Sequence, residues 1–443
     1  MNNTLAPSRR RLLALAGALP LASLVASCGP ASKPGISMLY FSGLAEGARI
    51  RNNIPRFMQD TGIKVTYDEL AYDSIRPRQL ESFRQNVGDY DVIFVDDVWM
   101  YEYATKGYLE DLTSRVSSDK FDLSDFSTKV LAAESTLASK TWLIPQRADV
   151  QVLFYNKAIF ADPGVQSAYL TNTHSALKVP QTWQEYAATA RGLSGISFEG
   201  HPIVGCAETL KRPHFAFEFF ATRYWSFSGD DFFDASFKPL FAQQSGIQAL
   251  DFLASLKDVW APGSLNAAHD ETISALASGT VAMAPQWYAA YATLKKPSGG
   301  LGARLGVALM PGIDIGSGKI RRAPSIGGGS LGISANSAHK DEAWSFIKFI
   351  TGRDIMAAGA LAGEIITRKS AYADPRVRQN NPSVDVYLQS LELSKFRPRS
   401  TEYAAIETAI GEGVSRVLAG EATASAALAD AVREVLRIQP QKA

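Results

Sequence analysis

The segment YDVIFV at residues 90–95 is apolar at almost every position, and it constrains the fold more than any other feature of the chain. A strand with one solvated face alternates apolar and polar residues, whereas a strand in a parallel sheet is buried on both faces and is apolar throughout. The preceding sequence predicts strands at 36–41 and 63–70, with helices at 44–61 and 76–86. This alternation of strands and helices indicates an open α/β sheet.

A later segment predicts a passage between two folded bodies. Residues 142–156, WLIPQRADVQVLFYN, are extended but interrupted by Pro145 and a polar patch, which predicts two strands in tandem. A chain of 443 residues is too long for one ordinary domain, so we expect two. Residues 297–332 are rich in glycine and are predicted to be irregular. Further helices are predicted at 181–193, 244–260, 269–278, 338–352, 402–418 and 424–437.

The charge balance excludes one broad class of partner. The chain has 45 Lys and Arg against 44 Asp and Glu, a net charge of +1. Nucleic-acid binding needs a basic surface that displaces counterions from phosphates, so no nucleic-acid partner is expected. Beyond the N-terminal segment no apolar run approaches the roughly 20 residues that cross a bilayer, so the body of the chain is expected to be soluble.

Residues 1–28 have the pattern of an export signal. Three arginines at 9–11 precede an apolar run at 12–26, which is too short to be a stable membrane span. Ser8 and the arginines, followed by two leucines, resemble a twin-arginine signal, although the general export route stays open. An ordinary buried helix is the alternative, but three consecutive arginines would fit poorly in a core.

The end of this segment resembles a bacterial lipobox. Small residues precede Cys28, which in such a pattern is acylated and becomes the mature N-terminus. Residues 29–35, GPASKPG, are predicted to be a tether, and the fold is predicted to start near Ile36. If Cys28 is acylated, Cys206 is the only remaining thiol, so no intramolecular disulfide can form and Cys206 is predicted to be a core residue.

Local motifs for catalysis or metal binding lack their required partners. GGSLG at 328–332 fits G-x-S-x-G, but a hydrolase of that type needs an acid and then a histidine after the serine, and only His339 follows, with no acid between. GSGKI at 316–320 lacks the opening glycine and the final Ser or Thr of a phosphate-binding loop. The histidines have no ligand spacing, so no metal ion or other cofactor is expected; they are His174, His201, His214, His269 and His339.

Several strings occur in the order and spacing of one known family. They are TGIKVTYD (61–68), YDVIFVDDVWMYEYATKGYLEDL (90–112), LIPQRADVQVLFYNKAIF (143–160), ALASGTVAMAPQW (275–287), KDEAWSFIKFITG (340–352), TRKSAYADP (367–375) and the group Arg397, Pro398, Glu402 and Tyr403. From Ile36 to its C-terminus the chain resembles the family 1 extracellular solute-binding proteins of the maltose-binding-protein type.

The resemblance implies two α/β lobes joined by three crossing strands, with a ligand cleft between them. The first lobe is expected at about 36–148 plus 309–332, and the second at about 149–308 plus 333–443. The resemblance also implies a monomer in the cell envelope that faces the periplasm or the exterior. Its expected role is to bind a small carbohydrate or polyol and deliver it to the transmembrane permease subunits of an ABC importer, without enzymatic activity.

The ligand contacts of such proteins correspond to specific residues here. Asp149 matches an acidic residue that accepts hydrogen bonds from ligand hydroxyls, and Trp287 matches an aromatic platform for a sugar ring. Asp149 is also compatible with a hinge or capping hydrogen bond, and Trp99 and Trp225 are also compatible with core positions. The other predicted ligand-binding residues are Ser42, Gly43, Asp96, Asp97, Trp99, Trp225, Gly328, Gly329 and Arg368.

One position departs from the family and leaves the ligand open. Many relatives carry tryptophan where Gly329 stands, so a common ring platform is absent and the pocket is expected to be wider or differently oriented. A polyamine is one alternative ligand, and an anion held by Arg147, Arg368 and Arg397 is another. An enzyme with Cys206 as nucleophile is a further alternative, although the sequence places no acid or histidine directly beside that thiol.

Acylation of Cys28 leads to a direct test. We expect Cys28→Ala to release the protein from membranes, because the predicted lipid anchor is the only attachment of a soluble body. Fractionation of cells that express the variant, followed by immunoblotting, measures this release. Retention of the Cys28→Ala protein in salt-washed membranes would contradict the lipoprotein prediction.

Overall fold

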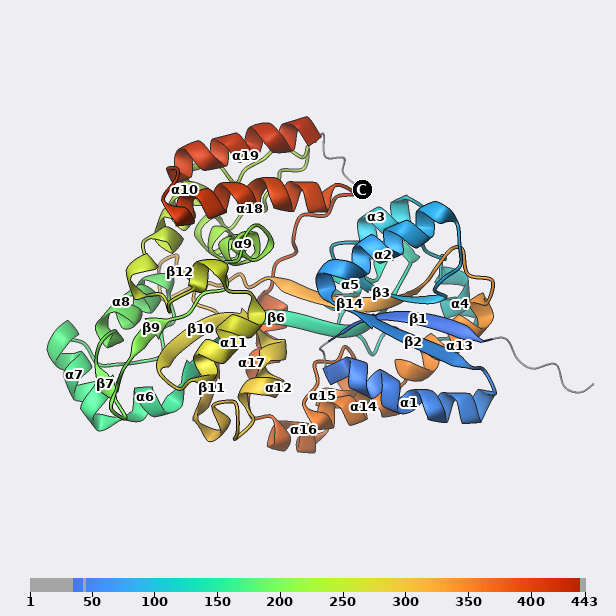
Figure 1. The fold of residues 1–443 in the computed structure, drawn as a ribbon, viewed down its shortest axis with the longest axis horizontal. Coiled ribbons are helices and arrows are strands. Elements are labelled where there is room, and N and C mark those ends of the chain that lie inside the picture. Colours follow the sequence, from blue (N-terminus) through green and yellow to red (C-terminus); the bar gives the residue numbers. More distant parts are fainter. Residues whose placement is uncertain (1–34, 43–44, 439–443) are drawn as a thin grey trace, which may run out of the picture. The chain divides into compact units, whose positions relative to one another are not determined.

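The computed structural model describes residues 35–42 and 45–438, so predictions that concern residues 1–34 and Gly43 lie outside the described residues. One eight-stranded sheet organises the fold (Figure 1). Its strand order is β2-β1-β3-β14-β6-β10-β9, with β11 also paired to β6. These strands are β1 (Ile36–Phe41), β2 (Val65–Leu70), β3 (Val92–Asp96), β6 (Ile144–Asn156), β9 (Val204–Cys206), β10 (Val281–Trp287), β11 (Leu305–Ala308) and β14 (Ile326–Ile333).

The N-terminal strands follow the predicted parallel pattern. β1 pairs in parallel with both β2 and β3, and every residue of β3 is buried, as its apolar sequence predicts. Helices α1 (Ala45–Thr61) and α2 (Tyr72–Gln85) connect these strands. The carboxyl end of β3 therefore brings Asp96 and the following Asp97 to one edge of the sheet, where ligands bind in open α/β folds.

The predicted irregularity of 297–332 is wrong at its end. Residues Ile326–Ile333 form β14, a fully buried strand that lies antiparallel to both β3 and β6 in the middle of the sheet. Consecutive glycines usually weaken a strand, but each one here faces a group that leaves no room for a side chain. A Cβ on Gly327 would lie 2.7 Å from the Trp287 ring, and a Cβ on Gly329 would lie 2.0 Å from the Phe94 ring.

The two strands predicted in tandem at 142–156 are one continuous strand. β6 runs for 13 residues through Pro145, and its first half pairs with β14. Its second half pairs with β10 and β11. Figure 1 shows β6 beside β14 at the centre of the molecule. A single strand therefore belongs to both halves of the sheet.

Two groups of helices pack against opposite halves of this sheet. α13 (Lys340–Ile350) contacts α1 and β14, whereas α18 (Tyr403–Ala419) contacts α9 (His214–Ser228). α19 (Ala424–Ile438) packs on α18, as Figure 1 shows in red. Before α18, the backbone N–H of Lys395 donates to the Pro324 carbonyl, and the Lys395 carbonyl accepts from the N–H of Ile326 at the start of β14.

The remaining α-helices have at most 11 residues. Helices are α3 (Met100–Thr105), α4 (Thr113–Ser118), α5 (Thr128–Glu134), α6 (Lys157–Ala161), α7 (Pro163–Thr173), α8 (Trp183–Leu193), α10 (Gln244–Ala254), α11 (His269–Ala277), α12 (Tyr291–Leu294), α14 (Arg353–Ala362), α15 (Lys369–Tyr372), α16 (Pro375–Asn380) and α17 (Val384–Leu393). Small strand pairs are β4 (Thr136–Leu137) with β5 (Lys140–Thr141), β7 (Ser197–Phe198) with β8 (His201–Pro202), and β12 (Ile313–Asp314) with β13 (Ile320–Arg321).

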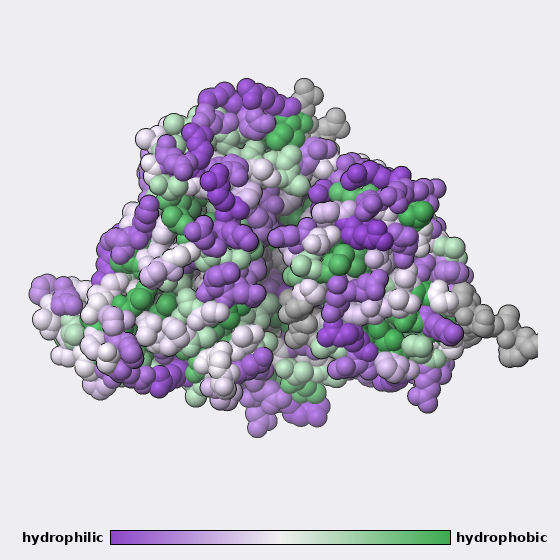
Figure 2. All heavy atoms as spheres, viewed as in Figure 1, coloured by the Kyte–Doolittle hydropathy of each residue, from purple (hydrophilic) through white to green (hydrophobic). Residues whose placement is uncertain are grey.

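The surface shows no broad apolar face in the view of Figure 2, where polar side chains separate small apolar patches. The large apolar side chains that are exposed lie far apart in the sequence: Val87, Leu170, Ile315, Leu393 and Leu436. Within residues 35–42 and 45–438, no helix has both the length and the apolar character needed to cross a membrane.

The packing of β14 leads to a stability prediction. We expect Gly329→Ala to lower the free energy of unfolding by about 1–3 kcal/mol, because the new methyl group would overlap the fully buried Phe94 ring. Urea unfolding monitored by circular dichroism measures the change. The control is Gly35→Ala, whose Cβ would lie 3.5 Å from its nearest neighbour and should change the stability little. Equal stability of the two variants would show that β14 has more room than the structure indicates.

Candidate ligand-binding site

Arg397 joins acidic residues from distant parts of the chain. Its Nη1 donates to Glu218 Oε1 of α9 at 2.9 Å. Its Nη2 donates to Asp96 Oδ1, at 3.2 Å, and to Asp97 Oδ1 at the end of β3. All four side chains are buried. Arg397 lies in the segment between α17 and α18, and its guanidinium links this segment to the end of β3 and to α9.

Aromatic rings surround this guanidinium and its partners. Arg397 lies 5.8 Å from the Trp287 ring centroid and 6.0 Å from that of Tyr403. The indole Nε1 of Trp287 donates to Glu218 Oε2 at 3.2 Å. The Tyr72 hydroxyl donates to Asp96 Oδ2 at 3.2 Å, and the Tyr72 ring lies 5.5 Å from that of Trp99. The site therefore combines charged groups with flat apolar surfaces.

His214 adds a second cation at the start of α9. Its Nδ1 lies 2.9 Å from Glu407 Oε1, and its Nε2 lies 3.4 Å from Glu218 Oε1. Burial by itself would lower the pKa of His214, but Glu407 and Glu218 outweigh burial and raise it to about 9. The imidazole is therefore protonated at neutral pH. In contrast, burial lowers the pKa of His269 to about 3, and this neutral ring lies 3.0 Å from Gln286 Oε1.

A second acidic position lies beside the glycines of β14. Glu134, the last residue of α5, is completely buried and accepts a hydrogen bond from Ser330 Oγ at 3.1 Å. Gly328 has φ of +149°, and a Cβ there would lie 2.3 Å from Glu134 Oε1. Burial raises the pKa of Glu134, and the nearby charge of Asp97 raises it further. A side chain at position 328 would thus displace this carboxyl group.

The charge state of the Arg397 cluster is set by a balance between burial and pairing. Burial raises the pKa of Asp97, and the opposing effect of Arg397 does not cancel it. Burial also raises the pKa of Glu218, against the effects of His214 and Arg397. The two cations therefore do not fully compensate the surrounding carboxyl groups.

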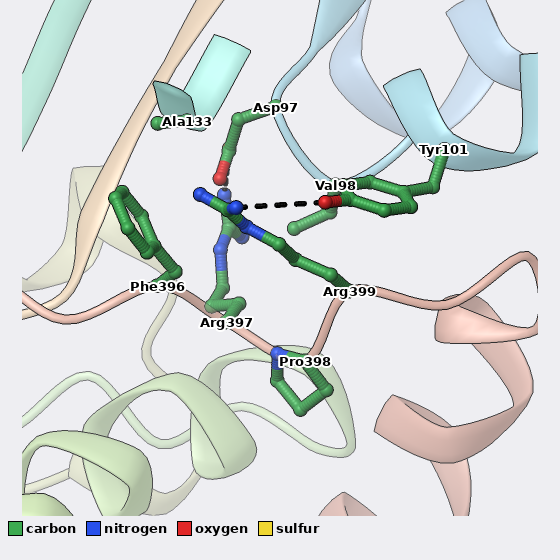
Figure 3. Close-up of a pocket in the computed structure, with 8 residues that line it drawn as sticks. All are labelled: Asp97, Val98, Tyr101, Ala133, Phe396, Arg397, Pro398 and Arg399. Atoms are coloured by element: carbon green, nitrogen blue, oxygen red, sulfur yellow. Dashed lines mark hydrogen bonds and ion pairs between the residues drawn. The ribbon is translucent and has the colours of Figure 1, made fainter. Parts of the chain in front are cut away.

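Two hollows lie along the segment between α17 and α18. Figure 3 shows the smaller one, with Arg397 directed toward Asp97 and with Arg399 Nη1 donating to the Tyr101 hydroxyl at 3.5 Å. Its volume of about 10 Å³ holds roughly one water molecule. A groove of about 790 Å³ shares part of this lining and extends to Phe233 and Phe237.

The structure brings most of the predicted ligand-binding residues into one neighbourhood. Gly329 of β14 pairs with Asp96 of β3 on one side and with Arg147 of β6 on the other. Asp149 Oδ2 accepts from Arg147 Nη2 at 2.9 Å, and its Oδ1 accepts from the backbone N–H of Ala289, close to Trp287. The predicted residues that lie here are Asp96, Asp97, Trp99, Asp149, Trp287, Gly328 and Gly329.

Other predicted residues have different surroundings. Ser42 follows β1, and its backbone N–H donates to the Leu70 carbonyl at 2.9 Å. Trp225 is completely buried in α9, where its ring meets Phe232 edge-on at 5.5 Å. Arg368 donates to the Thr351 carbonyl at 2.6 Å and pairs with Asp125 at 3.2 Å. Gly43 and Cys28 lie outside the described residues.

The sequence-based site omitted several central residues. Arg397 and Tyr403 occur in a string that resembles the family, so this signal was available. His214 and Glu218 are four residues apart, but the apolar sequence of α9 hides the face they share. Glu134 has no local sequence signal, because its role depends on the distant Gly328.

The thiol of Cys206 and the possible metal ligands of the described residues do not have the surroundings that a nucleophile or a metal centre needs. Cys206 is completely buried, and burial raises the pKa of its thiol, so it stays protonated and a poor nucleophile. In the part of the chain that the structure describes, no three His, Cys, Asp or Glu side chains are arranged to hold a metal ion. The geometry is suited to binding through hydrogen bonds, charges and ring contacts.

Comparisons with known proteins agree with this geometry. Residues 42–357 match the family model of the bacterial extracellular solute-binding proteins. A probable amino-acid ABC transporter periplasmic-binding protein of Sinorhizobium fredii is 23% identical over 342 residues, which cover 76% of this chain and 73% of the relative.

Two solved structures have the same fold. An ABC transporter solute-binding protein from Agrobacterium radiobacter, in complex with ribitol, is 24% identical with a TM-score of 0.80, and the match covers 93% of this chain and 100% of that one. Maltose-bound T. maritima MalE3 is 24% identical with a TM-score of 0.78, covering 92% and 100%. These matches confirm the predicted two-lobed α/β fold.

The Arg397 cluster leads to a prediction with a pH dependence. We expect Arg397→Met to lower the free energy of unfolding by about 3–5 kcal/mol, because it leaves Asp96, Asp97 and Glu218 without their shared cation. Removing the guanidinium raises the pKa of Asp97 further, and a carboxyl group whose pKa is raised by folding loses stability as pH rises. The deficit should therefore be larger at pH 8 than at pH 5.

Urea unfolding at several pH values measures this deficit. The control is Arg433→Met, which breaks the exposed pair of Arg433 with Asp430 and should cost less than about 1 kcal/mol. A deficit for Arg397→Met that does not depend on pH would contradict the proposed charge balance.

Proposed function

The chain belongs to the family of bacterial extracellular solute-binding proteins, and from this membership we propose that it binds a carbohydrate or polyol and delivers it to an ABC permease. The observation that carries this proposal is the combination of buried carboxylates with the rings of Trp287, Tyr403 and Tyr72. Carboxylates offer several acceptors to neighbouring hydroxyl groups, and ring faces pack against the C–H side of a sugar. The ribitol and maltose complexes of the similar structures support this class of ligand.

The proposed site contains the predicted residues near Arg397, together with further residues of the same cluster. The predicted residues are Asp96, Asp97, Trp99, Asp149, Trp287, Gly328 and Gly329, and the added ones are Tyr72, Glu134, His214, Glu218, Arg397, Tyr403 and Glu407. Ser42 and Gly43 stay as proposed contacts at the edge of the site. Trp225 and Arg368 are left out of the proposed site, because their contacts described above are with other residues.

The two lobes are proposed to close around the ligand. The first carries Asp96 and Asp97 at the end of β3, and the second carries Glu218 and Trp287. The contacts of α13 with α1 favour a place for it in the first lobe, and those of α18 with α9 favour the second. A ligand that touches both lobes favours the closed form by its differential affinity, so the permease can distinguish loaded from empty protein.

The proposed cellular setting follows from family and sequence together. Extracellular solute-binding proteins act in the periplasm or outside the cell. We propose that this chain is exported as a monomer, is anchored through acylated Cys28, and binds its ligand without converting it.

An amino acid is a second candidate ligand. The S. fredii relative is named as a probable amino-acid transport protein. The cluster also has charges of both signs, which an amino acid could engage through its ammonium and carboxylate groups.

A ligand screen tests the proposed function. We expect a sugar or polyol to raise the melting temperature, since binding to the native state alone adds about 2.7 kcal/mol of stability when the ligand is at 100 times its Kd. Small-angle scattering should show a smaller radius of gyration with that ligand, and chromatography should recover it unchanged. A converted ligand would favour an enzyme, and stabilisation by amino acids alone would favour the second candidate.

A site variant links this binding to the structure. We expect Trp287→Ala to weaken binding of the selected ligand by about 1–3 kcal/mol, or about 5- to 150-fold, because it removes a ring face. The comparison variant is Trp225→Phe, which keeps an aromatic ring against Phe232 and should leave the Kd unchanged. Calorimetry on folded protein measures both. An unchanged Kd for Trp287→Ala would place the ligand elsewhere.

A further inference from the structure

The proposed site has more acidic groups than basic ones. Arg397 contacts the carboxyl groups of Asp96, Asp97 and Glu218. His214 shares Glu218 and contacts a further carboxyl group, that of Glu407. Two cations thus face four carboxyl groups in a buried setting, where an uncompensated negative charge is costly.

Glu134 adds an acceptor that no other group in the described structure uses. Its side chain is completely buried, and its Oε1 makes no hydrogen bond there. That oxygen would lie 2.3 Å from a Cβ at position 328, so it packs directly against the backbone of Gly328. Ala133, the residue before Glu134, lines the small cavity together with Asp97 and Arg397. A buried polar atom without a partner is unusual and marks a place for a donor.

When no ligand is bound, protons on the carboxyl groups compensate part of the excess negative charge. Burial raises the pKa of Glu134, Asp97 raises it further, and Arg147 acts in the opposite direction. Burial also raises the pKa of Asp97, Asp96 raises it further, and Arg397 opposes this rise without cancelling it. Carboxyl groups in this state release their protons when a fixed positive charge arrives beside them.

The rings around the cluster also favour a positive charge. Trp287 and Tyr403 already lie within 6.0 Å of the guanidinium of Arg397. The hydroxyl of Tyr72 donates to Asp96, and the Tyr72 ring lies 5.5 Å from that of Trp99. The negative faces of aromatic rings attract ammonium groups as well as guanidinium groups. An anionic ligand is disfavoured, in contrast, because the Nη atoms of Arg397 already contact three carboxyl groups.

We propose that the ligand is an amino-substituted sugar or polyol, whose protonated amine lies near Glu134 and Asp97 while its hydroxyl groups use the remaining carboxylates and ring faces. This inference rests on the proposed function, because it specifies the ligand class of that same site. It explains both the unused oxygen of Glu134 and the acidic excess around Arg397.

Matched triplets of ligands test the inference. Each triplet contains a neutral sugar or polyol, its amino derivative and the N-acetylated amine, for example glucose, glucosamine and N-acetylglucosamine, across a panel of pentoses, hexoses and their polyols. For the stereochemistry that fits, calorimetry should show that the amine binds at least about tenfold more tightly than both uncharged members at pH 7.5. Titrations at about pH 6, where the amine is already protonated in solution, in buffers of different ionisation enthalpy should also show protons released upon binding of the amine only.

A variant assigns the effect to the acidic group. Glu134→Gln should weaken binding of the amine about tenfold more than it weakens binding of the neutral member, so most of the amine's advantage is lost. The matched control is Glu434→Gln on the exposed face of α19, which should preserve the advantage. Circular dichroism confirms that both variants are folded.

The possible failures are distinct. If neutral members bind as tightly as amines in every triplet that binds, or if proton release is absent, the inference is wrong while the proposed function stands. If no member of any triplet binds, the inference and the proposed function both fail. Tight binding of an amino acid with no binding of any triplet would replace both with the second candidate.

Discussion

The buried guanidinium of Arg397 is the interaction on which the site depends. It engages the end of β3 through Asp96 and Asp97, and it engages α9 through Glu218. β3 is a strand of the sheet and α9 is a helix, and the two lie far apart in the sequence. Charges buried at such a position are costly unless they are paired, so the surrounding rings and carboxyl groups are arranged around this one cation. In the proposed binding site, this network is the source of polar contacts for the ligand.

The N-terminal half of the sheet could be predicted from local patterns. The strand expected at 36–41 coincides with β1, and the apolar run 90–95 overlaps β3, because burial on both faces leaves a direct trace in composition. The position of Asp96 and Asp97 at a strand end followed from the same pattern. Such residues are predictable since their place depends on the neighbouring sequence.

The parts that could not be predicted depend on contacts between distant residues. β14 contains Gly327 to Gly329, which locally indicate a loop, and only the Trp287 and Phe94 rings explain why glycine is required in a strand. α9 was missed because it is buried on nearly all sides and so has no amphipathic period. Glu134 likewise becomes informative only when its unpartnered oxygen and Gly328 are seen together.

The place of β14 between β3 and β6 has a consequence for synthesis of the chain. β3 is complete by residue 96 and β6 by residue 156, but the strand that joins them ends only at Ile333. Until then both strands present unpaired edges, which are prone to pair with other chains. Contacts of such long sequence separation slow folding. While residues 157–333 are synthesised, β3 and β6 therefore lack the strand that joins them. Any export route or chaperone that receives the nascent protein has to shield these strand edges or wait until β14 has paired with them.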